Sequence, residues 1–218
     1  MSNGLFGDGA AHLGKSARTR ARLMDAAVEL FARDGFEAAS VNEIARRADV
    51  ANGTFYVHFR DKNEIASQVA LAIAGSVTRQ LDEAMSGIED AVERTSMGTR
   101  RFIDLVGNAP DWGRALLRAL WTFQALRNSV AGHLRDDLER GVAQGAFDVQ
   151  VDPVLIDVFV SMVMSGLFGR LSGSAPEDIA SRVAELQLRM LGVPADRART
   201  VSRQDLPPIS LSLVPISA

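Results

Sequence analysis

The stretch that decides the fold reads SVNEIARRADVANGTFYVHF and spans residues 40–59. Four apolar residues of its first half recur at helical spacing: Val41, Ile44, Ala45 and Ala48. This spacing predicts a short helix with one buried face. Ser40 followed by Glu43 forms the pattern of a capping box, which marks the start of that helix. The pattern breaks at Asp49, so we expect a tight turn before a second short helix.

The second short helix begins at about Asn52 and places two aromatic residues, Phe55 and Phe59, on its inner side. Small and polar residues stand at its start, outside the expected core. A short helix that buried aromatic side chains hold rigidly presents its front end outward. A helix-turn-helix presents its recognition helix to the major groove of DNA in this way. The pattern therefore predicts a DNA-binding unit.

Residues within this stretch and on both sides of it together form a known pattern: 26–31, Gly35, Phe36, Ile44, Ala45, Val50, 53–56, His58, Phe59 and Lys62. Through them the span from about Arg20 to Ile65 resembles the DNA-binding domain of the TetR family of bacterial repressors. The resemblance implies an all-α fold, with an N-terminal three-helix helix-turn-helix domain and a C-terminal helical domain for ligand binding and dimerisation. It also implies a homodimeric repressor that a small-molecule effector releases from a palindromic operator.

The composition is that of a folded protein without thiolate metal sites. Apolar residues make up 47% of the 218 residues, which is enough for a core and too many for a disordered chain. Cysteine is absent, so neither a disulfide nor a thiolate metal site can form. The N-terminus carries no apolar segment of secretory length. We therefore expect a cytoplasmic protein without a cofactor.

The net charge of −3 is unevenly distributed along the chain. Residues 1–62 hold nine Lys and Arg against eight Asp and Glu, whereas the remainder holds fifteen against nineteen. Residues 9–24 contain four basic residues and no acidic one. DNA binding needs a local basic surface rather than a basic protein, so the positive N-terminal end fits the predicted function.

The pattern along the chain suggests four segments. Residues 1–16 are rich in Gly and are predicted to form a flexible basic arm, followed by the helix-turn-helix domain over residues 17–61. Residues 62–193 are predicted to form a helical regulatory and dimerisation domain, whose last helix stops before Pro194. Residues 194–218 are rich in Pro and Ser and are expected to form a tail without an assigned function.

Residues 154–171 are apolar on nearly every side, and a helix of this kind is buried or lies in a membrane. Asp157 and the shortness of the apolar stretch weaken the membrane interpretation. We expect its own domain to cover one side and a second subunit the other, in a four-helix bundle across a two-fold axis. The predicted interface consists of Phe159, Met162, Val163, Gly166, Leu186 and Met190. A purely intramolecular core helix is the alternative.

The resemblance also implies DNA contacts, position by position. Ser40, Tyr56 and Lys62 match phosphate-contacting positions, and Asn42 can pair with adenine from the outer face of its helix. The predicted set is Arg18, Arg20, Ser40, Asn42, Ala51, Asn52, Gly53, Thr54, Tyr56, His58 and Lys62. Without the resemblance, a helical Tyr such as Tyr56 is more typical of a partly buried side chain with a hydrated hydroxyl.

Two residues depart from the family pattern. Asp49 stands where Gly is common in the turn, and Asp tolerates the left-handed backbone better than most residues. Ala51 stands where Ser usually caps the recognition helix, and the loss of such a cap costs about 1 kcal/mol. Asn52 is the alternative cap, and that role would compete with the reading of bases.

Residues 9–16 read GAAHLGKS and match the phosphate-loop pattern. This pattern supports nucleotide binding only between a strand and a helix, and no hydrophobic strand precedes Gly9. The motif leaves a nucleotide-binding enzyme that uses Gly9 to Ser16 as one alternative. A structural DNA-binding protein of the same fold is the other. We expect no enzymatic activity.

The second domain carries fewer signals. His133, Asp136 and Asp137 share a helical face, which is more typical of a solvated charged surface than of a metal site in a chain with three histidines. The candidate effector contacts are Arg101, Phe102, Trp112, Trp121, Phe123, Gln124 and Asn128. Aromatic walls with a few polar anchors are typical of a small-molecule site, but the sequence does not identify the effector.

Overall fold

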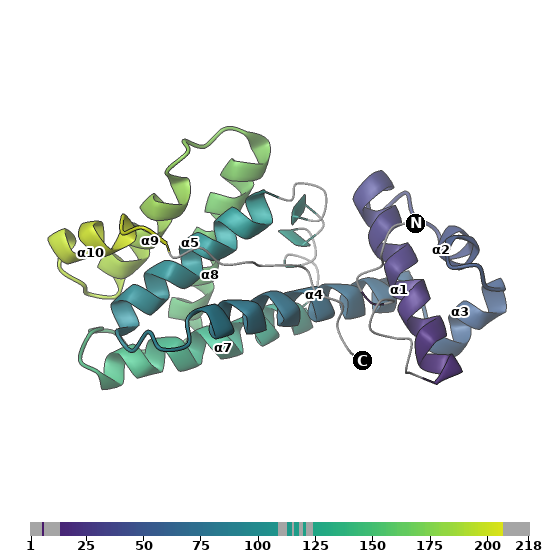
Figure 1. Cartoon of the computed structure of the whole chain (residues 1–218), viewed down its shortest axis with the longest axis horizontal. Helices are drawn as coiled ribbons and strands as arrows, with labels where there is room; N and C mark the ends of the chain where they lie inside the picture. The colour runs from purple at the N-terminus through teal and green to yellow at the C-terminus, as the bar shows by residue number, and fades with distance from the viewer. Residues whose placement is uncertain are drawn as a thin grey trace. The chain divides into compact units, whose positions relative to one another are not determined.

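The computed structural model describes residues 6, 14–108, 113–114, 116–117, 120 and 124–206, and within them the chain forms helices and connections but no strand (Figure 1). The helices are α1 Lys15–Asp34, α2 Val41–Arg47, α3 Asn52–His58, α4 Lys62–Ala84, α5 Ala91–Gly107, α7 Gln124–Ala143, α8 Pro153–Ser172, α9 Ile179–Met190 and α10 Ala195–Ser202. The expected all-α fold is confirmed.

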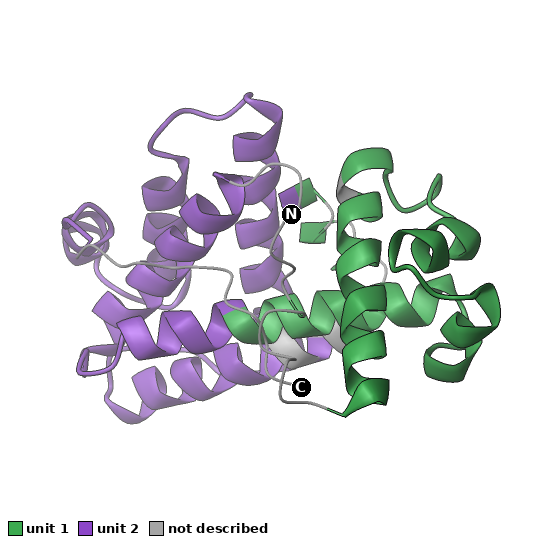
Figure 2. Cartoon of the chain, turned by 45° about the vertical axis from the view of Figure 1, so that its right-hand side comes forward, with its two compact units in different colours: residues 1–76, 114–126, 212–218 green, residues 77–113, 127–211 purple. Residues whose placement is uncertain are grey.

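The chain divides into two compact units (Figure 2). The first unit comprises residues 1–76, 114–126 and 212–218, and the second comprises residues 77–113 and 127–211. Helix α4 is continuous through residue 76 and so contributes to both units.

The first unit is organised around a small apolar core. Leu23 of α1, Ile44 of α2, Phe55 of α3, Phe59 and Ile65 of α4 are all fully buried. Burial of each large apolar side chain contributes about 1.5–3 kcal/mol, whereas an isolated helix of seven residues is unstable in water. The short helices α2 and α3 therefore exist because this core holds them.

The second unit has a core of its own, which includes Leu138, Phe147 and Leu188. Helix α5 packs against α8 and α9, and α10 packs against α9 and α5. At Gly166 of α8 an added Cβ would lie 2.8 Å from Val183 of α9 and 3.0 Å from Ile103 of α5. The absence of a side chain at Gly166 thus permits the close approach of the three helices.

The segment predicted as a tail begins with a helix that the sequence analysis missed. Helix α10 follows Pro194 and buries Ala198 and Val201, which lie three residues apart on one face. These two small apolar residues give a weak periodic signal in sequence, yet they complete the core. Residues 207–218, like residues 1–5 and 7–13 of the predicted arm, lie outside the described residues.

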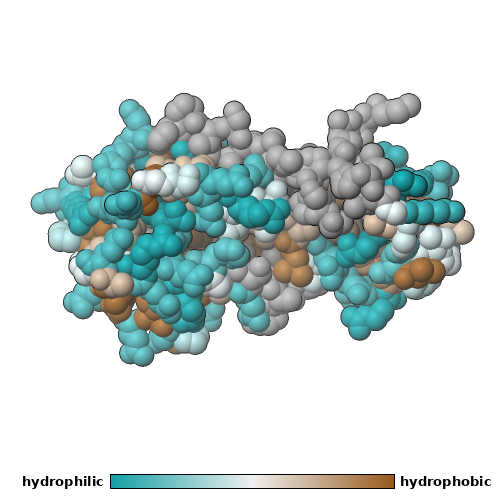
Figure 3. Space-filling model, turned by 60° about the horizontal axis from the view of Figure 1, so that its bottom comes forward, coloured by the Kyte–Doolittle hydropathy of each residue, from teal (hydrophilic) through white to brown (hydrophobic). Residues whose placement is uncertain are grey.

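Helix α8 is the one described helix that could cross a membrane by its length and composition. One such helix is weak evidence, because core helices of other proteins pass the same test. Its exposed positions include Asp157, Ser161 and Ser165, which are unfavourable in contact with lipid. On the face drawn in Figure 3 the described surface is mainly hydrophilic, with small, separate hydrophobic areas.

Two glycines of α7 offer a matched test of the packing in the second unit. An added Cβ at Gly141 would lie 2.1 Å from the buried Phe147 ring, whereas one at Gly132 meets nothing within 4 Å. We expect Gly141→Ala to lower the free energy of unfolding by about 1–3 kcal/mol through overpacking. Gly132→Ala should raise it by about 0.5–1 kcal/mol through helix propensity. Denaturant unfolding measures both, and equal effects would contradict the packing at Phe147.

Candidate nucleic-acid interface

Helix α2 begins with the predicted capping box. The Ser40 hydroxyl accepts a hydrogen bond from the Glu43 amide (3.2 Å), and the Ser40 amide donates to the Glu43 carboxylate (3.1 Å). The Ser40 hydroxyl also donates to that carboxylate, and these bonds hold the pKa of Glu43 below its ordinary value. The stabilisation from Glu43 is therefore present above the pKa of an unfolded glutamate and is lost as the pH falls through the lowered folded value.

This geometry bears on the predicted phosphate contact of Ser40. The Ser40 hydroxyl proton is directed to Glu43, so a phosphate would have to compete with a carboxylate for it. Asn42 points away from the core and is exposed, as its place on the outer face of α2 predicts. Ile44 and Ala45, which follow on the inner face, are buried.

The turn between α2 and α3 adopts the strained conformation expected at Asp49. Asp49 has a φ of 52°, in the left-handed region that few residues other than Gly adopt. After it, the Val50 amide donates to the Ala45 carbonyl (3.0 Å) and closes the turn. Ala51 occupies the cap position of α3 without a side-chain hydrogen bond. Asn52 is the first residue of the helix rather than its cap residue, and its side chain is exposed.

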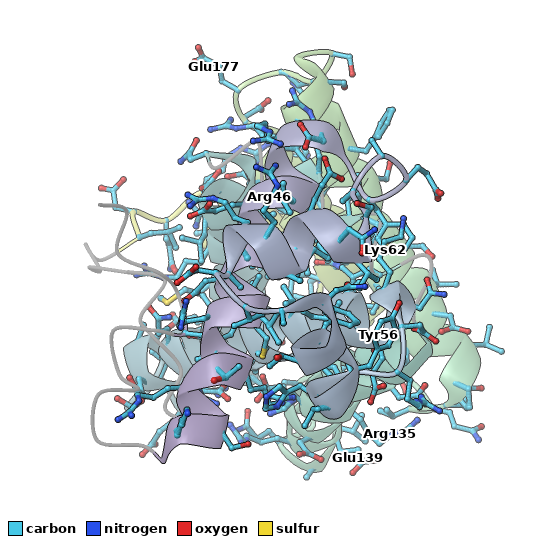
Figure 4. All side chains as sticks on the ribbon, turned by 90° about the vertical axis from the view of Figure 1, so that its right-hand side faces the viewer. Arg46, Tyr56, Lys62, Arg135, Glu139 and Glu177 are labelled. Atoms are coloured by element: carbon cyan, nitrogen blue, oxygen red, sulfur yellow. The ribbon has the colours of Figure 1, made fainter. Side chains whose placement is uncertain are left out.

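Helix α3 presents its front and outer face to solvent (Figure 4). Phe55 is fully buried, whereas Tyr56 and its neighbour Val57 are 56% and 78% exposed. A Cβ at Gly53 would meet no atom within 4 Å, so its backbone is open to an approaching surface. Thr54 is half-buried. The arrangement holds a short helix by its inner aromatic side and leaves its outer groups available for contact.

His58 ends the helix and is less accessible than Tyr56. Its side chain is half-buried, and its ring lies beside Phe59 with centroids 6.5 Å apart. His58 therefore has less freedom than Tyr56 to reach out from α3.

A shallow groove of about 470 Å³ lies between α2 and the start of α3. Its walls are Asn42, Ala45, Arg46, Asp49, Val50, Ala51 and Asn52. Three residues of the predicted DNA-binding set, Asn42, Ala51 and Asn52, thus share one surface.

Arg46 belongs to the same surface and was not among the predicted contacts. It is exposed one helical turn after Asn42 (Figure 4), and its charge acts on nearby Glu43 without a salt bridge. The spacing of four residues from Asn42 was the signal that could have identified it.

Lys62 has a structural role that differs from the predicted phosphate contact. Its ammonium group donates to three backbone carbonyls, those of Phe36 (2.8 Å), Ala39 (3.0 Å) and Glu37 (3.2 Å). It also lies 4.4 Å from the centre of the Phe36 ring. An ammonium group has three N–H donors, and the loop before α2 accepts all of them.

Arg20 is engaged inside the first unit in a similar way. Its guanidinium lies 5.1 Å from the centre of the Phe59 ring and donates to Gln68 of α4 (3.3 Å). This placement supports the core rather than an arm that follows DNA. Arg18, two residues earlier, is exposed.

The predicted dimer residues divide between core and surface. Phe159 and Gly166 are buried in the core of their own chain, and the Phe159 carbonyl accepts from Gln187 (3.1 Å). They are therefore withdrawn from the predicted interface. Met162, Val163 and Met190 are half-buried, and Leu186 is 53% exposed. Helical periodicity alone did not separate the inner from the outer sides of a helix that is apolar all round.

The candidate effector residues are only partly described. Arg101 is buried, and burial lowers its pKa; Phe102 beside it is half-buried. Asn128 is exposed on α7, which begins at Gln124. Trp112, Trp121 and Phe123 lie outside the described residues. The described residues therefore do not define an effector pocket.

The phosphate-loop pattern lies mostly outside the described residues as well. Its end, Lys15 and Ser16, forms the start of α1, and Gly14 precedes that helix. Among the described ranges there is no strand that could seat such a loop.

These features define a helix-turn-helix protein. A three-helix unit presents a short helix, and a second helical unit follows it in the sequence. Residues 23–69 match the model of the bacterial regulatory proteins of the tetR family, and residues 90–204 match that of the tetracyclin repressor-like C-terminal domain. Together these matches span most of the chain. The protein belongs to the TetR family and is a DNA-binding transcriptional regulator.

Individual relatives agree with this assignment. A regulator of Haemophilus influenzae, described as an uncharacterized HTH-type transcriptional regulator, is 32% identical over 195 residues, which cover 85% of this chain and 94% of the relative. The structure of RolR with resorcinol matches with a TM-score of 0.70 at 25% identity and covers 90% of this chain and 98% of its own. FadR of Bacillus subtilis with stearoyl-CoA has the same fold, with a TM-score of 0.63 at 20% identity over 78% of this chain and 96% of its own.

We expect Lys62→Met to lower the free energy of unfolding by about 2 kcal/mol, because it leaves carbonyl acceptors without their charged donor. Denaturant unfolding measures this loss. Lys15→Met is the matched control, since Lys15 is exposed at the start of α1 and its change should stay within about 0.5 kcal/mol. Unchanged stability with weakened DNA binding would instead support the phosphate contact predicted for Lys62.

Proposed function

We propose that the protein is a homodimeric repressor that binds a palindromic operator and leaves it when a small molecule binds. The observation that carries the proposal is the exposed front of α3, where Asn52, Gly53 and Tyr56 face solvent above a core that fixes the helix. In a helix-turn-helix the equivalent surface enters the major groove, and two-fold symmetry of the protein matches two-fold symmetry of the site. We place this activity in the cytoplasm, with no membrane partner.

The proposed roles of the DNA-facing residues follow their exposure. Asn42 can form two hydrogen bonds with adenine and is proposed to specify a base. Tyr56 is proposed to donate a hydrogen bond from its hydroxyl to a phosphate, and Arg46 is proposed as a second, charged phosphate contact. Lys62 and Arg20 act indirectly, by holding the loop before α2 and the Phe59 ring in place.

The proposed dimer interface is the outer side of α8 and α9. Exposed residues of α8 recur at intervals of three and four: Val154, Val158, Ser161, Ser165 and Phe168. Val154 and Phe168 are 69% and 61% exposed, and Leu186 of α9 adds a further exposed apolar side chain. A stripe of this spacing is what one helix presents to another in a bundle. Its polar members are small, so they permit close helix approach.

The proposed effector is a small, largely apolar molecule that binds the second unit. The support is the family itself and RolR, a chain of the same fold that is solved with resorcinol. If the effector binds better to a conformation whose two recognition helices are wrongly spaced, its binding must weaken the binding of DNA by the same factor.

The decisive experiment is the selection of bound duplexes from a random pool. We expect an enriched palindrome with two half-sites about one helical turn apart, as two symmetric recognition helices require. Asn42→Ala should relax the preference at one position of each half-site, at a cost of about 1–3 kcal/mol per contact. Tyr56→Phe should weaken binding to operator and unrelated DNA alike. Enrichment of sequences without internal symmetry would refute the homodimeric mode.

The dimer interface is tested by placing a charge on its apolar stripe. Phe168→Asp buries an unpaired charge if the stripe meets a second subunit, so we expect monomers in analytical ultracentrifugation at micromolar concentration. Val142→Asp is the control, because Val142 is an exposed apolar residue of α7 outside the stripe. Dissociation by both substitutions, or by neither, would argue against this interface.

A further inference from the structure

The turn of the helix-turn-helix holds a carboxylate in an unusual backbone position. Asp49 is the one described residue other than Gly with a positive φ. A glycine would adopt this conformation without strain, so the side chain costs stability here. That side chain is 98% exposed and contributes nothing to the apolar core.

An arginine from the first helix pairs with this carboxylate. Arg22 donates from one terminal nitrogen to the Ala48 carbonyl, the Asp49 carbonyl (3.2 Å) and one Asp49 carboxylate oxygen (3.3 Å). It thereby satisfies carbonyls at the C-terminal end of α2, where a positive charge is favourable. The second carboxylate oxygen of Asp49 has no partner among the described residues. Arg22 is itself 48% exposed, so solvent screens the pair and much of the negative charge remains effective.

The carboxylate belongs to the groove between α2 and α3. Asn42 and Asn52, which also line it, can donate or accept hydrogen bonds, and Arg46 can only donate. Asp49 is the acceptor-only group of this groove. A DNA phosphate beside Asp49 would meet a like charge and one beside Arg46 an opposite charge, whereas an amino group of a base beside Asp49 would meet an acceptor.

Cytosine is the base whose edge suits an acceptor-only group. In the major groove it offers its N4 amino donor without an acceptor beside it, whereas adenine sets N7 next to its amino group. Guanine and thymine present acceptor oxygens there. A carboxylate can therefore accept from cytosine without an acceptor beside the donor on the same base, whereas adenine sets N7 beside its donor and guanine and thymine offer only acceptors.

We propose that Asp49 is a specificity-determining residue that accepts a hydrogen bond from cytosine N4 in each half-site and opposes binding through phosphates alone. This inference rests on the proposed function as an operator-binding dimer. Arg22 is the positioning residue, because it pairs with one oxygen of the Asp49 carboxylate. The strained backbone at Asp49 then lowers the stability of the fold but places an anion in the turn, which Gly would not provide.

The test compares Asp49→Asn and Asp49→Gly with the wild-type chain. Asn also tolerates the left-handed backbone but replaces one acceptor oxygen with a donor, and Gly removes both side chain and strain. Each variant would be used in pool selection and in binding titrations with operator and unrelated duplexes at one salt concentration. We expect the cytosine preference to disappear in both variants. The ratio of the affinity for the operator to the affinity for unrelated DNA should fall by about fivefold or more. Part of this fall should come from tighter binding of unrelated DNA.

Glu37→Gln is the matched control for charge. Glu37 is exposed in the loop before α2, and the substitution changes the net charge by the same amount. An unchanged ratio in this control together with a lower ratio in the Asp49 variants supports the proposal. Equal changes in all three variants would assign the effect to net charge and overturn it.

Two further outcomes separate this inference from the proposed function. If the wild-type chain selects a palindrome that lacks a cytosine dependent on Asp49, the operator-binding function stands and the role of Asp49 is wrong. If the wild-type chain selects no palindrome, the proposed function fails and the inference fails with it. Asp49→Gly relieves strain, so it keeps the test valid if Asp49→Asn folds poorly.

Discussion

The structure depends on the burial of two phenylalanines, Phe55 and Phe59, in the core of the first unit. Helix α3 has only seven residues and no side-chain cap at Ala51, so its own hydrogen bonds cannot keep it folded in water. The phenyl rings fix both its position and its rotation. Because they take the inner side, Tyr56 lies on the outer side of α3, and the exposed surface of this helix is a consequence of the core.

Several basic residues of the first unit have partners within the chain. Lys62 donates to three carbonyls of the loop before α2, and Arg20 lies over the Phe59 ring. Arg47 pairs with Glu29, and Arg60 pairs with Glu64. A count of basic residues therefore overstates the charge that is available to phosphates. Arg46 is exposed and forms no salt bridge with a described residue, so its charge remains accessible.

The second unit uses its most apolar helix on two sides. The inner side of α8 meets α5 and α9 so closely that a side chain at position 166 would displace Val183 or Ile103. Its outer side carries the exposed stripe that ends at Phe168. A helix that is apolar on two sides has little amphipathic pattern, so its sequence does not show which side faces the core. For this reason the buried Phe159 was predicted at an interface. The distinction between the sides arises from which helices lie beside α8.

The sequence by itself determined the local elements: the capping box at Ser40, the left-handed turn at Asp49 and the inward direction of Phe55. Each depends on interactions within a few residues, and such interactions can be predicted from the spacing and type of the residues. Only the tertiary structure decided that Lys62 holds a loop, that Arg22 pairs with the Asp49 carboxylate and that α10 completes the core. These contacts join residues that are far apart in the chain. The sequence around a Lys or Arg is the same whether its charged end contacts a carbonyl or solvent, so the sequence does not distinguish the two.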